Sequence, residues 1–421
     1  MNQKTNVSMA EGSQTSLVTK PELLSPAGDM EQLIMAVAYG ADAVYLGGLS
    51  FGLRASAGNF SSDELTEAIQ MCHGRGVKVY VTCNAVLRNE DVFSLPGFLE
   101  ELAEVGADAV IVSDIGALTL SRKYAPSIDI HISTQAGVFN FETARALHEM
   151  GASRIILARE LPLHEIARIR ENTPPELELE AFVHGSMCVA ISGRCLLSNY
   201  LTGRDANRGS CTQPCRWKYS LVEEHRPGEY FDITEDSGGT YIMNSRDLCM
   251  IDHIPEMIDA GVTGLKIEGR MKSAYYAAVV TNAYRRAIDA ATAGQPLEDV
   301  WRSEVHKVSH REYSTGFYFD AEGPGQYCGD SMYISDCDVV AVVESCMDDG
   351  NACLTQRNKF SLGETLELLT PTDRPVEFIV SELFDADRNH IESAPHPMME
   401  LRMRLPKYAP RYSLLRKRRV Q

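Results

Sequence analysis

The chain has 421 residues and a formal net charge of −18, and hydrophobic side chains make up 44% of it. This length suits one domain of about 250–300 residues with a smaller second one, and the composition excludes a wholly disordered chain. The negative charge excludes a protein that coats nucleic acid without specificity, although a local basic region can still contact phosphates. Residues 1–20 are polar, lack the apolar segment of a secretory signal and are interpreted as a flexible tail.

The chain contains no run of apolar residues as long as the roughly 18 needed to cross a membrane, so we expect a cytoplasmic protein without a membrane partner. It has 11 cysteines. An odd number in a reducing compartment argues against a disulfide framework. Clustered cysteines there usually serve metal, cluster or redox chemistry.

Residues 21–294 alternate between short apolar runs and amphipathic helical stretches. The runs are Glu22–Ser25, Ala43–Gly47, Lys78–Cys83, Ala109–Ser113, Asp129–Ser133, Arg154–Ala158, Glu178–Val183 and Gly264–Glu268. A doubly wound open sheet produces the same alternation, but eight runs followed by a long helix over Ser273–Ala293 favour a (β/α)8 TIM-like barrel. In that fold, functional side chains follow the strands at one end of the barrel.

The connection between the seventh and eighth runs, about residues 186–261, is far longer than the others and contains five of the cysteines. Long insertions at this end of a barrel are usually functional. Residues 295–332 are predicted to be a linker with local structure, and 333–405 a small all-β barrel with short strands. The last part, 406–421, is predicted to be a basic tail, either simply solvated or able to contact phosphates.

Four cysteines of the insertion, Cys188, Cys195, Cys211 and Cys215, lie within 28 residues with the spacing C-x6-C-x15-C-x3-C. Four thiolates bind either Zn²⁺ or a [4Fe–4S] cluster. Zinc sites usually combine two tight pairs, and only the last two cysteines are spaced that way, so we favour a cluster over zinc. Unliganded cysteines are the remaining alternative. The fourth ligand is Cys215 or Cys249, and we favour Cys215 because it is close in sequence.

The segment around the first of these cysteines resembles a known family signature. Glu180–Cys188 has the sequence EAFVHGSMC, and Gly193–Ser198 has the sequence GRCLLS. Both resemble the pattern of peptidase family U32, the collagenase-like family. Shorter matches occur at Glu22–Gly28, Asp42–Gly47, Asn244–Leu248 and Lys266–Arg270. The resemblance extends from about residue 21 to about residue 405.

The resemblance implies RNA modification more than proteolysis. One branch of the family is required for 5-hydroxyuridine at the tRNA wobble position and needs prephenate, a small dicarboxylate. Another branch hydroxylates a cytidine of large-subunit ribosomal RNA, and a third acts on ubiquinone precursors and carries [4Fe–4S] clusters on cysteines. One barrel with a small β-domain is most similar to the tRNA branch. We therefore expect a uridine hydroxylase that binds tRNA, prephenate and a [4Fe–4S] cluster.

The sequence leaves two other functions as alternatives. A peptidase of the collagenase-like family is one, but His148 and His164, each followed by Glu, lack the second His of a zinc protease motif. Gly48–Gly52 matches G-x-S-x-G, yet a nucleophile elbow needs a helix directly after Ser50, where the sequence is loop-like. The other alternative is a non-catalytic RNA-binding scaffold whose cluster only stabilises the insertion.

Polar side chains follow most of the predicted strands, where such a barrel has its active site. The candidate catalytic residues are Glu180, His184, Glu268 and Arg270. The candidate substrate-binding or anion-binding residues are Asn84, Gln135, Arg159, Lys266, Arg270, Arg208 and Arg216. A salt bridge inside the barrel or a helix cap is the structural alternative for each, and a cap accounts well for Asp114.

Two basic segments are candidates for ligand contact. Gly269–Ser273 joins the eighth strand to a helix N-terminus, where backbone N–H groups and two cations suit a dicarboxylate or an RNA phosphate. Around the last two cysteines of the cluster lie Arg204, Arg208, Arg216, Trp217, Lys218 and Tyr219. Cations interleaved with aromatic rings suit unstacked RNA bases, and cations also balance the charge of a Cys-ligated cluster.

Overall fold

The computed structural model describes residues 20–53, 58–188, 190–191, 194–195, 197–217, 235–236, 239–240, 246–319 and 334–419. Several sequence-based assignments lie outside these residues. They are residues 1–19 and 420–421 of the predicted tails, residues 320–332 of the predicted linker, Gly193, Leu196, Lys218, Tyr219, Asn244, Ser245 and the side chain of Arg216.

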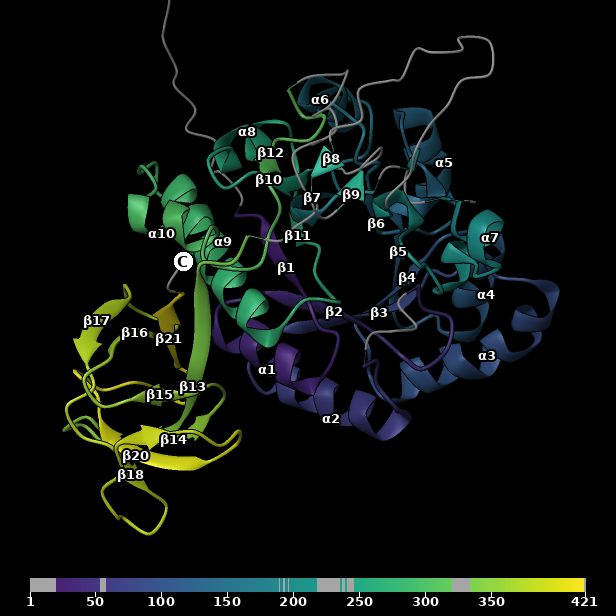
Figure 1. Ribbon diagram of the computed structural model, residues 1–421. Helices are drawn as coiled ribbons and strands as arrows, with labels where there is room; N and C mark the ends of the chain where they lie inside the picture. Colours follow the sequence, from purple (N-terminus) through teal and green to yellow (C-terminus); the bar gives the residue numbers. More distant parts are fainter. Residues whose placement is uncertain are drawn as a thin grey trace, which may run out of the picture.

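Eight parallel strands form a closed barrel in the larger domain (Figure 1). They are β1 (Glu22–Pro26), β2 (Ala43–Gly47), β3 (Lys78–Cys83), β4 (Ala109–Val112), β5 (Asp129–Ile132), β6 (Arg154–Ile156), β7 (Glu178–Ser186) and β11 (Gly264–Ile267). β11 pairs in parallel with both β1 and β7, which closes the ring. The predicted (β/α)8 fold is confirmed, and the eight predicted runs coincide with the eight barrel strands.

Helices cover the outside of the barrel. They are α1 (Met30–Ala38), α2 (Ser62–His73), α3 (Asn89–Glu104), α4 (Ile115–Tyr124), α5 (Phe141–Glu149), α6 (Leu163–Glu171), α8 (Ile254–Asp259) and α9 (Ala274–Thr292). Local sequence determines where several of them begin. Ser61 and Glu64 form a capping box at α2, and the Asp114 carboxylate accepts a hydrogen bond of 2.9 Å from the Ala117 amide at α4. The cap expected for Asp114 is therefore confirmed.

The long insertion begins within β7, a strand of nine residues. The first half of β7 pairs with β11, and the last three residues of β7 pair antiparallel with β10 (Asp247–Cys249). β12 (Tyr313–Ser314) adds a parallel strand to β10. The other described elements of the insertion are α7 (Leu197–Thr202), the 3₁₀ turns η3 (Ala206–Arg208) and η4 (Pro214–Arg216), β8 (Glu235–Asp236) and β9 (Gly239–Thr240).

The C-terminal domain is a curled antiparallel sheet with its own apolar core. In sheet order its strands are β17 (Val376–Ile379), β16 (Thr365–Leu369), β21 (Leu414–Arg418), β13 (Cys337–Cys346), β14 (Asn351–Gln356), β20 (Glu400–Arg404) and β18 (Phe384–Asp385). A separate short pair joins β15 (Phe360–Ser361) to β19 (Ser393–Ala394). The predicted basic tail is wrong for the described residues after 405, because β21 lies between β13 and β16 inside this sheet.

Arg416 of β21 connects the two domains through hydrogen bonds. Its fully buried guanidinium donates hydrogen bonds of 2.7 Å to both carboxylate oxygens of Glu304, at the end of α10 (Asp299–Glu304), and one of 2.7 Å to Glu367 in β16. Most other basic residues near this end of the chain also have acidic partners. These ion pairs are formed by Arg402, Lys407, Arg411, Lys417, Arg418 and Arg419. Their charge is thus largely balanced within the domain, which weakens the alternative that these residues contact phosphates.

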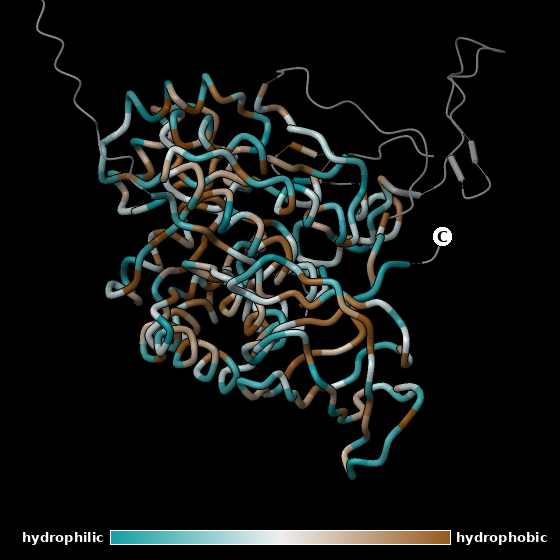
Figure 2. Tube along the Cα trace, turned by 90° about the vertical axis from the view of Figure 1, so that its left-hand side faces the viewer, coloured by the Kyte–Doolittle hydropathy of each residue, from teal (hydrophilic) through white to brown (hydrophobic). Residues whose placement is uncertain are grey.

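The larger core fills the barrel and the layer between its strands and helices. Figure 2 shows the hydrophobic segments mainly inside the molecule and many hydrophilic ones along the outer turns. None of the helices in the described ranges is both long and apolar enough to span a membrane.

Candidate active site at the barrel mouth

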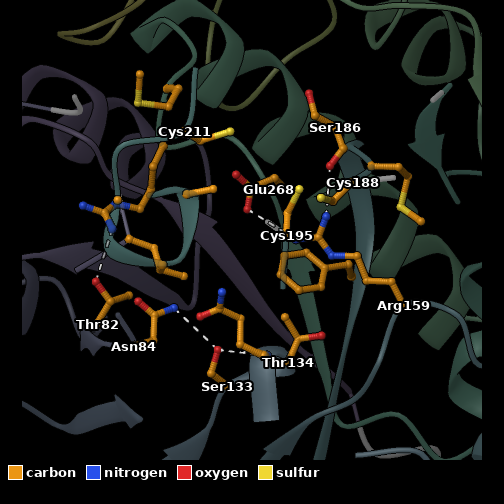
Figure 3. Close-up of a pocket in the computed structure, with 18 of the residues that line it drawn as sticks. Thr82, Asn84, Ser133, Thr134, Arg159, Ser186, Cys188, Cys195, Cys211 and Glu268 are labelled. Carbon is orange, nitrogen blue, oxygen red and sulfur yellow. Dashed lines mark hydrogen bonds and ion pairs between the residues drawn. The ribbon is translucent and has the colours of Figure 1, made fainter. Parts of the chain in front are cut away.

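A cavity of about 530 Å³ lies at the carboxyl ends of the barrel strands (Figure 3). Its walls combine residues that follow β3, β5, β6, β7 and β11 with residues of the insertion. Tyr45, Ile111, Ile156 and Phe182 supply apolar surface. A volume in this range suits a small molecule or one nucleotide, and the position is the one at which TIM barrels carry their active sites.

All four cysteines of the predicted cluster line this cavity. Figure 3 shows Cys188, Cys195 and Cys211 around the same space. Cys188 and Cys211 are exposed, whereas Cys195 and Cys215 are partly buried. Among the described residues, no three His, Cys, Asp or Glu side chains are grouped as a formed metal site. The thiols are therefore gathered at one cavity, but a bound metal would have to draw them closer together.

Cys249, the alternative fourth ligand, is not among the residues that line this cavity. It pairs with His184 in the register between β10 and β7, and its Sγ lies 3.9 Å from the Tyr284 hydroxyl. Burial raises the pKa of the Cys249 thiol to about 11. Its position therefore favours Cys215 over Cys249.

Asn207 connects the cysteine segment to the barrel. Its side-chain oxygen accepts a hydrogen bond of 3.1 Å from the Cys195 amide, and its nitrogen donates one of 2.9 Å to the Cys195 carbonyl. The Asn207 carbonyl accepts from the amide of Val86, in the loop after β3, at 2.9 Å. These bonds connect the Cys195 backbone, through Asn207, to the loop after β3.

Arg208 strengthens the same connection. It forms an ion pair of 2.6 Å with Asp91 and donates a hydrogen bond of 3.0 Å to the Val86 carbonyl. It lines a smaller neighbouring cavity of about 300 Å³ instead of the main one. Arg204 and Trp217, the other described members of the predicted RNA-binding group, are exposed and lie outside the main cavity wall. The predicted ligand contact by Arg208 thus competes with a structural role.

A charge swap distinguishes these two roles. We expect Arg208→Glu to destabilise the protein by about 1 kcal/mol through loss of the pair and repulsion from Asp91, and Asp91→Arg with Arg208→Glu to restore most of that stability. Thermal unfolding and tRNA binding would be measured for both variants. If the double variant regains stability but not tRNA binding, Arg208 contacts RNA directly.

The charged residues of the cavity wall make it electropositive. Four cations line it, Arg159, Lys266, Arg270 and Lys272, against one carboxylate, Glu268. The Arg159 guanidinium lies 3.9 Å from the centroid of the Phe182 ring, donates a hydrogen bond of 3.0 Å to the Ser186 carbonyl and is 3.8 Å from Glu268. In a protein with a net charge of −18, this local excess of positive charge indicates a site for an anion.

Arg270 is held in a fixed position. Its guanidinium donates a hydrogen bond of 3.2 Å to Thr82 and another to the Asn59 side chain. Gly47 packs so closely against the guanidinium that any Cβ at this position would collide with it. A buried guanidinium placed this way at the cavity wall suits recognition of a carboxylate or phosphate.

Glu180 is not among the residues that line the cavity, although the sequence made it a catalytic candidate. It is fully buried in the barrel, where its carboxylate lies 2.8 Å from Lys266 and 3.0 Å from Arg154. Burial raises the pKa of Glu180, but the two cations outweigh this effect and hold its pKa below the usual value. Its position suits a counter-charge that orients Lys266 more than a group that contacts substrate.

His184 is also absent from the cavity wall. The register between β7 and β11 shifts after Lys266, so that His184 pairs with Ile267. Its ring nitrogens lie 3.3 Å from the Tyr284 hydroxyl and 3.2 Å from the Tyr313 hydroxyl. Burial and the nearby cations hold the pKa of His184 well below its usual value, so the ring stays neutral at physiological pH. It packs among tyrosines rather than facing the cavity.

Neutral polar groups form another part of the cavity wall. Asn84 follows β3, and Ser133, Thr134 and Gln135 follow β5. Of these four, only the amide residues Asn84 and Gln135 were predicted from the sequence. Thr82, which supports Arg270, was not predicted either. Side chains alternate along a strand, so Thr82 lies on the same side of β3 as Tyr80. This alternation is the sequence signal that could have identified Thr82.

The G-x-S-x-G match does not form a nucleophile elbow. Ser50 and the described residues after it, as far as Leu53, are in bends and irregular structure, and α2 begins only at Ser62. A nucleophile elbow requires a helix directly after the serine. This segment therefore gives no support to the peptidase alternative.

The fold and the cavity define a TIM-like barrel protein with a cysteine-lined, electropositive mouth. Residues 28–326 match the family model described as "Peptidase family U32", and residues 335–416 match "Peptidase family U32 C-terminal domain". The chain belongs to peptidase family U32.

Its relatives carry different names. A tRNA hydroxylation protein of Bacillus subtilis is 36% identical over 406 residues, which are 95% of this chain and 96% of that protein. A 23S rRNA 5-hydroxycytidine synthase of Escherichia coli is 36% identical over 310 residues, 71% of this chain and 45% of that protein. An uncharacterized protease of Methanocaldococcus jannaschii is 45% identical over 303 residues, 71% of this chain and 73% of that protein.

Proposed function

We propose that this chain is an RNA-modifying enzyme that hydroxylates tRNA, with 5-hydroxyuridine at the wobble position as its product. The observation that carries the proposal is the match to the Bacillus subtilis tRNA hydroxylation protein, which covers 95% of the chain and so includes both domains. The relative named as a 5-hydroxycytidine synthase supports chemistry at the same carbon of a pyrimidine. An anticodon loop already exposes its bases, so little unstacking is needed to bring one to the cavity.

We further propose that Cys188, Cys195, Cys211 and Cys215 bind a [4Fe–4S] cluster at the barrel mouth. Support comes from the donor set, because four thiols line one cavity and Cys-only sites of this kind suit iron–sulfur clusters. When bound, such a cluster supplies iron that transfers electrons or polarises an oxygen-bearing ligand. Zinc is the lower-ranked occupant of the same thiols.

A small dicarboxylate, prephenate in the family resemblance, is proposed to bind the cationic wall of the cavity. Arg270 and Lys266 are both nearly fully buried there, and Lys272 and Arg159 add positive charge. Two carboxylates can pair with separate cations across one cavity, where Glu268 lies near Arg159 and Glu180 pairs with Lys266. This wall would orient the dicarboxylate next to the cysteines.

The proposal is tested by mass spectrometry of tRNA nucleosides. The chain would be expressed in a bacterial host that lacks its own tRNA hydroxylation genes, with the empty vector as control. We expect uridine carrying one additional oxygen to appear in tRNA, and to decrease at least tenfold in Arg270→Met and in a host unable to make prephenate. Modified nucleosides found only in ribosomal RNA, or in neither RNA, would contradict the proposal.

A further inference from the structure

We propose that Gln135 and Asn84 read the hydrogen-bonding edge of the target uracil and so determine which base is accepted. This inference rests on the proposed function, since it assigns part of the same cavity to the base. It assigns the neutral amides of the cavity wall to the base and the cations to the anion.

The main observation is a pair of unsatisfied amide oxygens on residues of the cavity wall. Gln135 is only 5% exposed and lines the cavity wall, yet its side-chain oxygen has no hydrogen-bond partner among the described residues. The side-chain oxygen of Asn84, on the same wall, is buried and lacks a partner in the same way. Buried polar atoms are almost always satisfied, because desolvation without a hydrogen bond is unfavourable. Two such atoms at one cavity indicate that a ligand donates a hydrogen bond there, and the single N3–H of a uracil can satisfy one of the two oxygens.

Ser133 links these two amides. Its hydroxyl lies 3.5 Å from the side-chain nitrogen of Asn84 and accepts a hydrogen bond of 3.3 Å from the backbone amide of Gln135. Gln135 belongs to the short 3₁₀ turn η1 (Thr134–Ala136), and the Thr134 hydroxyl fastens this turn to the Leu157 carbonyl at 2.9 Å. Figure 3 shows Asn84, Ser133 and Thr134 together along one side of the cavity. The turn thus positions both amides before any ligand arrives.

The chemistry of these groups suits a base better than an anion. An uncharged amide carries an acceptor and a donor side by side, and uracil presents the complementary pair, the N3–H next to a carbonyl oxygen. A carboxylate or phosphate has no N–H to donate to the amide oxygens, and Arg270 and Lys266 offer it far stronger partners. The apolar side chains of Ile111 and Ile156 also line the cavity and can contact the faces of a ring.

The binding test compares two probes that separate the two sides of the cavity. Uridine, which is a neutral nucleoside, would report on the amide side, and succinate on the cationic side, both measured by ligand-observed NMR on the purified full chain. We expect Gln135→Met to weaken uridine binding by roughly tenfold to a hundredfold, because Met keeps the shape but removes the hydrogen bonds. Succinate binding is expected to stay the same. Asn84→Leu should act in the same direction, and provides a second variant if one of them fails to fold.

Gln356→Met is the matched control. Gln356 is as deeply buried as Gln135 and also has a side-chain oxygen without a partner in the described structure, but it lies in β14 of the C-terminal domain. Gln356→Met should leave the binding of uridine and of succinate unchanged. If the Gln135 and Asn84 variants bind uridine like the wild type, or lose uridine and succinate binding together, the inference is overturned. The same holds if the wild type hydroxylates tRNA without detectable binding of uridine.

Hydroxylation in the host strain keeps this inference separate from the proposed function. If the wild type produces no hydroxylated tRNA nucleoside, the proposed function fails whatever the probes show. If the wild type produces it and Gln135→Met lowers it at least tenfold at an unchanged melting temperature, the inference is supported. A wild-type level of modified uridine in Gln135→Met would overturn the inference alone.

Discussion

Replacing Cys188 or Cys211 with alanine is expected to remove the metal centre and reduce tRNA hydroxylation to background. Each of the four thiols that line the cavity would supply one ligand of the proposed cluster. Loss of one thiolate leaves an iron with an open position, and Cys-ligated clusters are unstable in that state. Protein purified without air should contain about four iron and four sulfide per wild-type chain and absorb visible light, and both variants should lose these properties.

Two other cysteines serve as controls for this result. Cys249→Ala removes a partly buried thiol near the Tyr284 hydroxyl, and Cys353→Ala removes a partly buried thiol in the C-terminal domain. Both should keep wild-type iron content. Loss of iron in Cys249→Ala but not in Cys215→Ala would reverse the proposed ligand set. Colourless wild-type protein with one zinc, or with no metal, would exclude the cluster and leave the cysteines as zinc ligands or as free thiols.

The architecture of the barrel could be predicted because its signals are local. Each strand is a short apolar run, and helix ends are marked by caps such as Asp114 and by glycines such as Gly106, which has a φ of +82°. The last strand was missed for a different reason. β21 consists of two leucines followed by three basic residues, and its charges are balanced by Glu304 and Glu367, far away in the sequence. A sequence pattern cannot show such distant partners.

The difference between local signals and distant partners also applies to the site. Spacing alone predicted the four cysteines, and the structure brings all four to one cavity. The catalytic candidates Glu180 and His184 depended on where β7 ends and which way its side chains face. That orientation follows from the register shift opposite Lys266 and from the pairing with β10, which begins more than sixty residues further along the chain. Strand pairing over this separation has no local signature.

Glu180→Gln is expected to destabilise the protein by about 3–5 kcal/mol. The substitution keeps the shape of the side chain but leaves Lys266 and Arg154 without the carboxylate that lies within 3.0 Å of both. Lys266 is 4% exposed and Arg154 is 1% exposed, so water cannot take the place of the lost charge. Denaturant-induced unfolding at neutral pH measures the difference.

Glu178→Gln is the matched control for this change. Glu178 lies two residues earlier in β7 and pairs with the same Arg154 at 2.6 Å, but its side chain is 45% exposed. Solvent screens such a pair, and its loss should cost less than about 1 kcal/mol. Equal losses of stability in both variants would show that burial does not determine the effect.

The contribution of Glu180 to the stability of the fold changes with pH in a definite direction. Because the pKa of Glu180 is lower in the folded protein than in the unfolded chain, ionised Glu180 stabilises the fold above the unfolded value of about 4.3. This stabilisation is lost as the pH falls through the lower folded value, so the difference between wild type and Glu180→Gln should shrink on acidification. A difference that is independent of pH would contradict the role of the charge. If Glu180→Gln instead keeps wild-type stability and abolishes hydroxylation, the reaction needs a carboxylate that the fold does not, and Glu180 acts by positioning Lys266 at the cavity wall.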